Sequence, residues 1–466
     1  MNDFPPQPLS PLDGRYRSAV APLTEFLSEA GLNRARVEVE VEWIIHLTNN
    51  RLFGTSPLAA GVKEKLRLAY RDFGQAQIDQ LAETERTTRH DVKAVEYFVR
   101  DRLAQLELDD LSELTHFALT SEDVNSASYA LTVKRAVEDA WLPAFRGVIE
   151  KLRAMALDLA DAPMLSRTHG QPATPTTMGK ELGVFVWRLQ RALAGIEQTE
   201  FMAKFSGATG TWSAHIAAAP HVAWPNVTRE FIEGPLGLTF NPLTTQIEPH
   251  DWQVELYDRV RHAGAILHNL AQDIWTYISL GYFTQTPVAG ATGSSTMPHK
   301  INPIKFENAE ANLEIAGGLF GTLGQTLVTS RLQRDLTDST TQRNIGVAFG
   351  HSLLALTNIS GGLGQISLAR DVLLADLDGN WEVLAEAIQT VIRAEVVAGR
   401  SQIRDPYALL KDLTRGHRIG SAELVEFVAG LDISDDAKQR LSALTPADYT
   451  GLAESAVRAR LGEARL

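Results

Sequence analysis

The sequence predicts an all-α fold of three helical domains, built around a central bundle of long helices. Apolar residues recur every three or four positions over long stretches, which is the periodicity of one helix face. The alternating pattern of β-strands is scarce. Periodic stretches beyond about 25 residues are typical of bundles rather than of ordinary globular packing. With 44% hydrophobic and 22% charged residues among 466, the chain has a composition that supports one or more large cores.

Two apolar stripes define the longest predicted helices. The first begins at Thr176, predicts a helix of about thirty residues, and consists of Met178, Leu182, Phe185, Leu189, Leu193 and Ile196. The second follows Asp251, ends at Gly281, a residue type that commonly terminates helices, and consists of Leu256, Val260, Ala263, Leu267, Leu270 and Ile274. Further long helices are predicted from 303 to 329 and from 343 to 360.

Composition shifts divide the chain into three predicted domains. Residues 1–110 form a helical domain with a proline-rich start, residues 111–365 hold the long helices, and residues 366–466 form shorter helices broken by Gly, Asp and Pro. Within the middle domain, residues 281–303 are rich in Gly, Thr, Ser and Pro. A structureless stretch of this length inside a compact domain is usually functional or disordered. We therefore expect a mobile active-site lid there.

The charge and the residue types exclude several classes of function. The net charge is −13, so the chain has no basic footprint for nucleic acid or for a membrane surface. The absence of cysteine excludes disulfides, thiolate nucleophiles and cysteine-ligated metals. No apolar run approaches the ~20 residues of a membrane helix, and the first residues lack the pattern of a signal peptide. We therefore expect a cytoplasmic protein.

The sequence also gives no sign of a cofactor. Neither a P-loop nor a dinucleotide-binding Gly-x-Gly-x-x-Gly motif is present. Residues 248–251 include Glu, His and Asp side chains, but Pro249 and the lack of a second histidine pair argue against a metal site. We expect neither a metal nor an organic cofactor.

Residues 293–303 read Gly-Ser-Ser-Thr-Met-Pro-His-Lys-Ile-Asn-Pro and carry the strongest chemical signal. A loop with a hydroxyl (Ser294), a fixed cation (Lys300) and an amide (Asn302) can remove a proton and stabilise the anion that results. Taken alone, the stretch is equally a polar surface loop that ends at a proline helix start.

Residues 166–175 hold His169 between two prolines and beside Gly170, which predicts a rigid, non-helical turn. A histidine titrates near neutral pH, so one that faces a cleft can donate a proton to a departing nitrogen. The alternative is a histidine that only fastens the loop through hydrogen bonds to the backbone.

Three further segments leave binding and structural interpretations open. Asp91 either caps the helix through residues 93–100 or takes part in chemistry. Thr120 and Ser121 either cap a helix or bind an anion at its N-terminus. Residues 330–344 mix arginines with acids, so they form either a carboxylate or phosphate site or a salt-bridged surface.

Together these segments resemble a known family. The Gly-Ser-Ser-x-Met-Pro string is similar to the signature of the fumarase/aspartase superfamily, which eliminates fumarate from succinyl-type substrates. The narrower resemblance, to the adenylosuccinate lyase family in its longer bacterial subtype, rests on residues 88–92, 167–172, 245–251 and 334–339. It covers nearly the whole chain. One departure is that Ala291 and Thr292 stand where relatives often carry an acidic residue.

The resemblance implies elimination of fumarate from adenylosuccinate to give AMP, and from the succinylaminoimidazole-carboxamide ribotide of purine biosynthesis. It implies Ser294 as the general base, His169 as the general acid and His90 as a second site histidine. Lys300 and Asn302 would stabilise the carbanion. The implied substrate contacts are Arg15, Tyr16, Arg89, His90, Asp91, Thr120, Ser121, Gln246, Asn308, Arg334, Ser339 and Arg343.

The resemblance further implies a homotetramer whose central helices merge into one bundle and whose active sites draw on three subunits. Two other functions remain as alternatives: a sibling lyase acting on argininosuccinate, and an inactive structural relative. The joint presence of His169, Ser294, Lys300 and Asn302 favours an enzyme over a scaffold.

Overall fold

The computed structural model describes residues 8–287, 297, 300–414 and 419–462, and helices dominate them, as the sequence predicts. The chain divides into two compact units. The first unit comprises Met1–Arg146, Ala192–Ala265 and Ala311–Thr357, and the second comprises Gly147–Arg191, Ile266–Glu310 and Asn358–Leu466. The three domains expected from the sequence stay a prediction.

Five long helices contain the boundaries between the two units: α7 (Leu142–Asp158), α8 (Met178–Glu197), α11 (Asp251–Ser279), α12 (Ile304–Leu327) and α14 (Ile345–Leu363). The last three lie close to their predicted limits. Helix α8 has 20 residues and is shorter than predicted. Its start moves from Thr176 to Met178 because Thr176 and Thr177 pair with the strand 163–168 instead, and β-branched threonines suit a strand. The larger part of the difference is at the C-terminal end, because the helix ends at Glu197.

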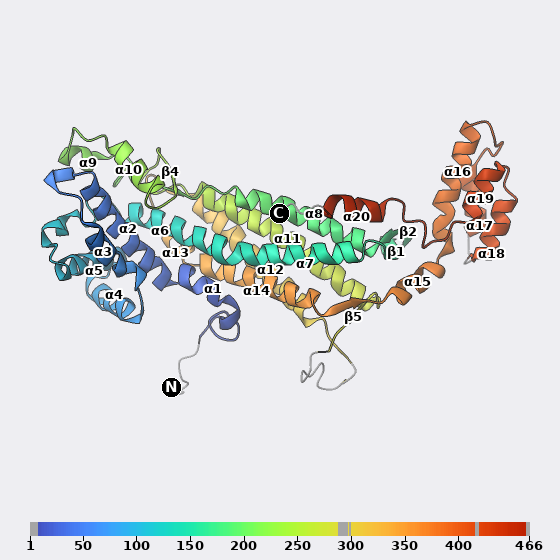
Figure 1. Cartoon of the computed structure of the whole chain (residues 1–466), viewed down its shortest axis with the longest axis horizontal. Helices are drawn as coiled ribbons and strands as arrows, with labels where there is room; N and C mark the ends of the chain where they lie inside the picture. The colour runs from blue at the N-terminus through green and yellow to red at the C-terminus, as the bar shows by residue number, and fades with distance from the viewer. Residues whose placement is uncertain (1–7, 288–296, 298–299, 415–418, 463–466) are drawn as a thin grey trace. The chain divides into compact units, whose positions relative to one another are not determined.

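The first unit holds the N-terminal helices and a continuous helical stretch that begins at Ser121 (Figure 1). Its elements are α1 (Arg17–Leu27), α2 (Glu29–Asn49), η1 (Leu52–Gly54), α3 (Ala60–Arg71), α4 (Gln75–Thr88), α5 (Asp91–Gln105), η2 (Asp109–Leu114), α6 (Ser121–Arg135), η3 (Ala136–Trp141), β3 (Met202–Ala203), α9 (Ser213–Ala218), α10 (Trp224–Glu233), β4 (Thr239–Phe240) and α13 (Thr337–Gln342). Helix α2 contacts α3, α5 and α6, which explains why it is buried on several sides, charged residues such as Arg36 and Glu40 included.

The second unit holds the C-terminal helices and two short sheets. Its elements are β1 (Pro163–Thr168), β2 (Gln171–Thr177), β5 (Phe283–Gln285), β6 (Ile366–Leu368), α15 (Arg370–Asp378), η4 (Trp381–Leu384), α16 (Ala385–Val397), α17 (Pro406–Thr414), α18 (Ser421–Ala429), α19 (Asp435–Ser442) and α20 (Ala453–Leu461). Helices α16, α18 and α19 pack around an apolar cluster that includes Ile388, Leu424 and Leu441 (Figure 1). Strand β5 corrects the expectation that 281–303 is structureless throughout, because backbone pairing with β6 orders its first part.

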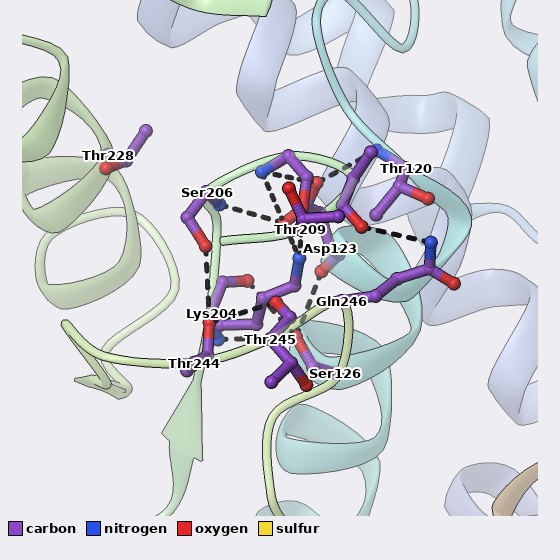
Figure 2. Close-up of polar contacts among 12 residues, drawn as sticks. Thr120, Asp123, Ser126, Lys204, Ser206, Thr209, Thr228, Thr244, Thr245 and Gln246 are labelled. Carbon is purple, nitrogen blue, oxygen red and sulfur yellow. Dashed lines mark hydrogen bonds and ion pairs between the residues drawn. The ribbon is translucent and has the colours of Figure 1, made fainter. Parts of the chain in front are cut away.

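A fully buried ion pair fixes the start of α6 in the first unit (Figure 2). The Lys204 Nζ lies 2.8 Å from the Asp123 Oδ1, and neither side chain has exposed surface. The Asp123 carboxylate also accepts hydrogen bonds from the backbone N–H groups of Thr120, Ser206 and Gly207. The Lys204 Nζ donates a second bond to the Gly207 carbonyl at 2.7 Å. These bonds join the first turn of α6 to residues 204–207.

His215 lies in the same part of the first unit and is completely buried. Its ring makes an edge contact with Trp224, with 4.9 Å between the ring centroids. Within the described part of the chain, neither ring nitrogen has a hydrogen-bond partner. Burial therefore lowers the pKa of His215 from 6.5 to about 4, and the imidazole is neutral at physiological pH.

Replacing Lys204 by methionine should strongly destabilise the chain. The Asp123 charge would stay buried without its counter-charge, and removing one partner of a buried pair typically costs about 3–5 kcal/mol. Urea denaturation should show this loss, and adding Asp123→Asn should recover part of it by removing the uncompensated charge. Lys134→Met is the control, because Lys134 also donates to a glycine carbonyl but is partly exposed. Equal stability of the Lys204 and Lys134 variants would contradict the importance of the buried pair.

The neutral His215 should make stability depend on pH. Between pH 6.5 and 4 the unfolded chain carries the proton on this residue and the folded chain does not, so stability is complete above pH 6.5 and falls with acidification. The loss amounts to about 1.4 kcal/mol for each pH unit in this window. The stability of the wild type relative to His215→Phe, which cannot titrate, should therefore fall from pH 7 to 4, as measured by denaturation curves. A stability difference that is independent of pH would refute this role of His215.

Candidate active site

The structure places His169 at the tip of a β-hairpin in the second unit. Strands β1 and β2 pair in antiparallel fashion, and Thr168 faces Gln171 across the turn. His169 and Gly170 both have positive φ angles, of 55° and 76°, as in two-residue hairpin loops. The predicted non-helical turn is therefore confirmed. It leaves the His169 side chain exposed, where an imidazole can reach a substrate.

Lys300 and Asn302, expected to stabilise the carbanion, also belong to the second unit, whereas the second site histidine, His90, belongs to the first. Ser294 lies outside the described residues. Lys300 is exposed, and its backbone N–H donates to the Met297 carbonyl at 3.0 Å. Asn302 is half-buried ahead of α12. On α12, the Asn308 Oδ1 accepts a hydrogen bond from the Asn358 Nδ2 at 2.9 Å.

In the first unit, His90 and Asp91 sit at the start of α5. His90 is the cap, since its Nδ1 accepts the Lys93 backbone N–H at 3.2 Å. This corrects the idea that Asp91 caps the helix: Asp91 is the first helical residue, and its carboxylate instead pairs with Arg36 and Arg343 at 3.0 and 3.4 Å. Burial raises the pKa of Asp91, but the Arg36 charge and other contacts outweigh it and hold that pKa below its ordinary value.

Thr120 and Ser121 form the start of α6, and Thr120 is its N-cap, as one of the two interpretations proposed. Both are half-buried, so their side chains keep some access to solvent. The Thr120 backbone N–H donates a hydrogen bond to the Asp123 carboxylate at 2.9 Å. The positive end of the helix and the two hydroxyls are compatible with an anionic ligand, although the cap alone explains their presence.

Arg334 contacts both Gln246 and the buried carboxylate of Glu122, a residue of α6. The Arg334 Nη2 lies 2.9 Å from the Glu122 Oε1, and the Arg334 Nη1 lies 3.4 Å from the Gln246 Oε1. Gln246 also donates to the Ala208 carbonyl at 3.0 Å (Figure 2). Burial raises the pKa of Glu122, and the charge of Arg334 opposes that rise.

A continuous series of bonds joins this group to Asp91. The Asn125 Nδ2 donates to the Glu122 Oε1 at 2.8 Å, and the Asn125 Oδ1 accepts from the Arg36 Nε at 2.9 Å. Arg36 then pairs with Asp91. We call Glu122, Asn125 and Arg36 the buried polar link. It brings Arg334 and Gln246 into one bonded set with Asp91 and Arg343.

Sequence reasoning missed all three residues of the buried polar link. Charged and amide residues near a helix start usually face solvent or interact with the helix dipole, so Glu122 gave no sign of burial. The spacing of Glu122 and Asn125, three residues apart, places them on one helix face and was a usable signal.

The remaining predicted contacts lie elsewhere in the first unit. The Arg15 guanidinium lies 5.9 Å from the centre of the Tyr16 ring, and Tyr16 precedes α1. Arg89 follows α4 with a positive φ of 52°. Ser339 lies on α13, beside an Asp338 carboxylate that is 3.4 Å from the His250 Nε2.

The described residues contain no group of three or more His, Cys, Asp or Glu side chains that could hold a metal ion. Among the same residues, every helix is too short or too polar to cross a lipid bilayer.

Comparisons with known proteins match the chain over nearly its full length. Residues 14–317 match a family model described as "Lyase", and residues 330–450 match "Adenylosuccinate lyase C-terminal". The chain is 46% identical to an adenylosuccinate lyase of Vibrio cholerae, with 96% of this chain and 97% of the relative covered. It is 45% identical to that of Escherichia coli K12 over 96% of each chain, and 42% identical to that of Dictyostelium discoideum over 95% and 96%.

Two solved structures share the fold of this chain. A 3-carboxy-cis,cis-muconate lactonizing enzyme from Pseudomonas putida aligns with a TM-score of 0.73 at 20% identity, over 94% of this chain and 96% of that one. A fumarate lyase from Mesorhizobium sp. BNC1 aligns with a TM-score of 0.74 at 19% identity, over 95% and 97%. The family models and the full-length relatives confirm the prediction from the motifs: the chain belongs to the adenylosuccinate lyase family of carbon–nitrogen lyases, within the fumarase/aspartase superfamily.

Proposed function

We propose that this chain eliminates fumarate from adenylosuccinate to give AMP, and from the succinylaminoimidazole-carboxamide ribotide to give the free carboxamide ribotide. The observation that carries the proposal is the similarity, at 41–46% identity, to relatives that bear the name adenylosuccinate lyase. No cofactor is needed, since the reaction moves one proton from carbon and one proton onto nitrogen.

The chemistry requires a base, an acid and stabilisation of negative charge. Ser294, as its alkoxide, removes the proton from the carbon beside a succinyl carboxylate, and the electron pair delocalises onto that carboxylate. Lys300 and Asn302 stabilise this charge, and one well-placed donor of this kind is worth about 3–4 kcal/mol. The electrons then form the fumarate double bond as the carbon–nitrogen bond breaks, and His169 protonates the departing purine nitrogen.

The first unit supplies groups suited to an anionic substrate. The whole chain carries a net charge of −13, so local cations have to overcome a repulsive field. Arg334 and Arg343 provide such cations: Arg334 pairs with Glu122, and Arg343 pairs with Glu29 and Asp91. A guanidinium fixed in this way can bind phosphate or carboxylate through two parallel bonds. The half-buried start of α6 adds N–H and hydroxyl donors.

A shared site in a homotetramer completes the proposal. His169, Lys300 and Asn302 belong to the second unit, whereas Arg334 and Asp91 belong to the first. A site that draws these groups from different subunits would account for motifs so far apart in the sequence.

Ser294→Ala should lower turnover of adenylosuccinate by at least about 100-fold, because general base catalysis commonly contributes that much or more. The rate is measured by the change in ultraviolet absorbance as AMP forms, and folding by circular dichroism. Ser295→Ala, at the adjacent hydroxyl, is the control and should keep most of the activity. Wild-type-like turnover by the Ser294 variant would remove this serine from the mechanism. A wild-type protein that splits argininosuccinate and releases no AMP would refute the proposed substrate.

Shared sites predict complementation between inactive variants. Mixing His169→Ala with Ser294→Ala after mild dissociation should restore activity, because some sites in a mixed oligomer receive both intact residues. Recovery of up to about a quarter of the wild-type rate is the expectation if the two residues come from different subunits. Mixed oligomers, verified by mass spectrometry, that stay inactive would contradict the sharing.

A further inference from the structure

The buried polar link lies behind residues assigned to the substrate, yet its own members have almost no access to solvent. The exposed fractions are 3% for Glu122, 7% for Asn125 and 3% for Arg36. Two buried ionisable groups of opposite charge, bridged by an amide, are costly to desolvate unless each is well paired. Their burial therefore indicates a structural role for these residues rather than direct contact with solvent or ligand.

Arg334 depends on this link for its placement. Its side chain is 21% exposed, so the guanidinium is mostly enclosed. Glu122 contacts one terminal nitrogen at 2.9 Å, whereas the contact of the other with Gln246 is longer, at 3.4 Å. The Arg334 Nε is buried and has no hydrogen-bond partner among the described residues. Of these contacts, the ion pair with Glu122 is the shortest and the only one between opposite charges, so it holds the guanidinium most strongly.

The two hydrogen bonds of the Asn125 amide determine which way its oxygen and its NH₂ group point. Its NH₂ group donates to the Glu122 carboxylate, and its oxygen accepts from the Arg36 guanidinium. The reverse orientation would place the oxygen against a carboxylate and the NH₂ group against a cation, which is unfavourable at both ends. The amide thus couples the position of Glu122 to that of Arg36, and through Arg36 to Asp91.

We propose that Glu122 is a positioning residue for substrate binding: it holds the Arg334 guanidinium in the orientation that receives an anionic group of the substrate, and the buried polar link keeps Glu122 in place. This inference rests on the proposed function, in which Arg334 binds substrate. Glu122 itself, enclosed behind Arg334, takes no part in proton transfer. An arginine has a long, flexible side chain, so a fixed partner reduces the ordering that binding would otherwise require.

The test is Glu122→Gln, which keeps the shape of the side chain and removes its charge. We expect the KM for adenylosuccinate to rise about tenfold or more, equivalent to about 1.4 kcal/mol, while kcat stays within about threefold. Glu38→Gln is the matched control. Glu38 also pairs with an arginine of the first unit, Arg135, at 2.7 Å, but it lies outside the link. That variant should change thermal stability without raising KM.

A double-mutant cycle separates positioning from general destabilisation. If Glu122 acts through Arg334, then Glu122→Gln should add less than about twofold to KM in an Arg334→Gln background. Independent, multiplicative effects of the two substitutions would overturn the inference, as would an unchanged KM in a well-folded Glu122→Gln protein. If Glu122→Gln does not fold, Glu122→Asp provides the same readout, because it keeps the charge but shortens the reach to Arg334. A wild-type protein that does not cleave adenylosuccinate would refute the proposed function instead.

Discussion

The ion pair between Lys204 and Asp123 is the interaction that fixes the start of α6, one of the candidate binding elements of the first unit. Two charges without solvent contact are stable only when every bond around them is made, and here the carboxylate takes three backbone N–H donors in addition to the ammonium group. These bonds set the first turn of α6. Glu122, the preceding residue, owes its direction to that turn. The placement of Arg334 thus depends, through Glu122, on a fully buried ion pair.

Charge alternates from this turn outward through the first unit. The buried Glu122 faces the partly exposed Arg334, and the buried Arg36 faces the partly exposed Asp91, with the Asn125 amide between them. Each enclosed charge therefore holds an opposite charge nearer the solvent. In a chain with a net charge of −13, this arrangement allows arginines to be presented locally without an excess of basic residues on the surface.

Features that depend on nearby residues were predicted from the sequence: the long helices from the periodicity of apolar residues, and the turn at His169 from the prolines and the glycine around it. Helices α11, α12 and α14 and the turn at His169 lie where the sequence placed them. The start of α8 differs from the prediction because Thr176 and Thr177 pair with the neighbouring strand β1 and so belong to strand β2. The burial of Lys204 was not predictable, since its partner Asp123 lies far along the chain; for Glu122 the only local signal was Asn125 on the same helix face, whereas Arg334 is distant in sequence. Ser294 was singled out from the hydroxyl, cation and amide of residues 293–303, but its role as general base came from the resemblance, and it lies outside the described residues.

The two units use different physical means to position their groups. In the second unit, backbone geometry suffices: two consecutive positive φ angles at His169 and Gly170 place the imidazole at the hairpin tip. Such a turn tolerates changes in neighbouring side chains as long as the glycine remains. In the first unit, compensated charges do the positioning, and the loss of one charge leaves its neighbours uncompensated. A substitution in the charged set of the first unit should therefore disturb the neighbouring binding groups as well. A substitution beside the hairpin tip should affect only the residues around it.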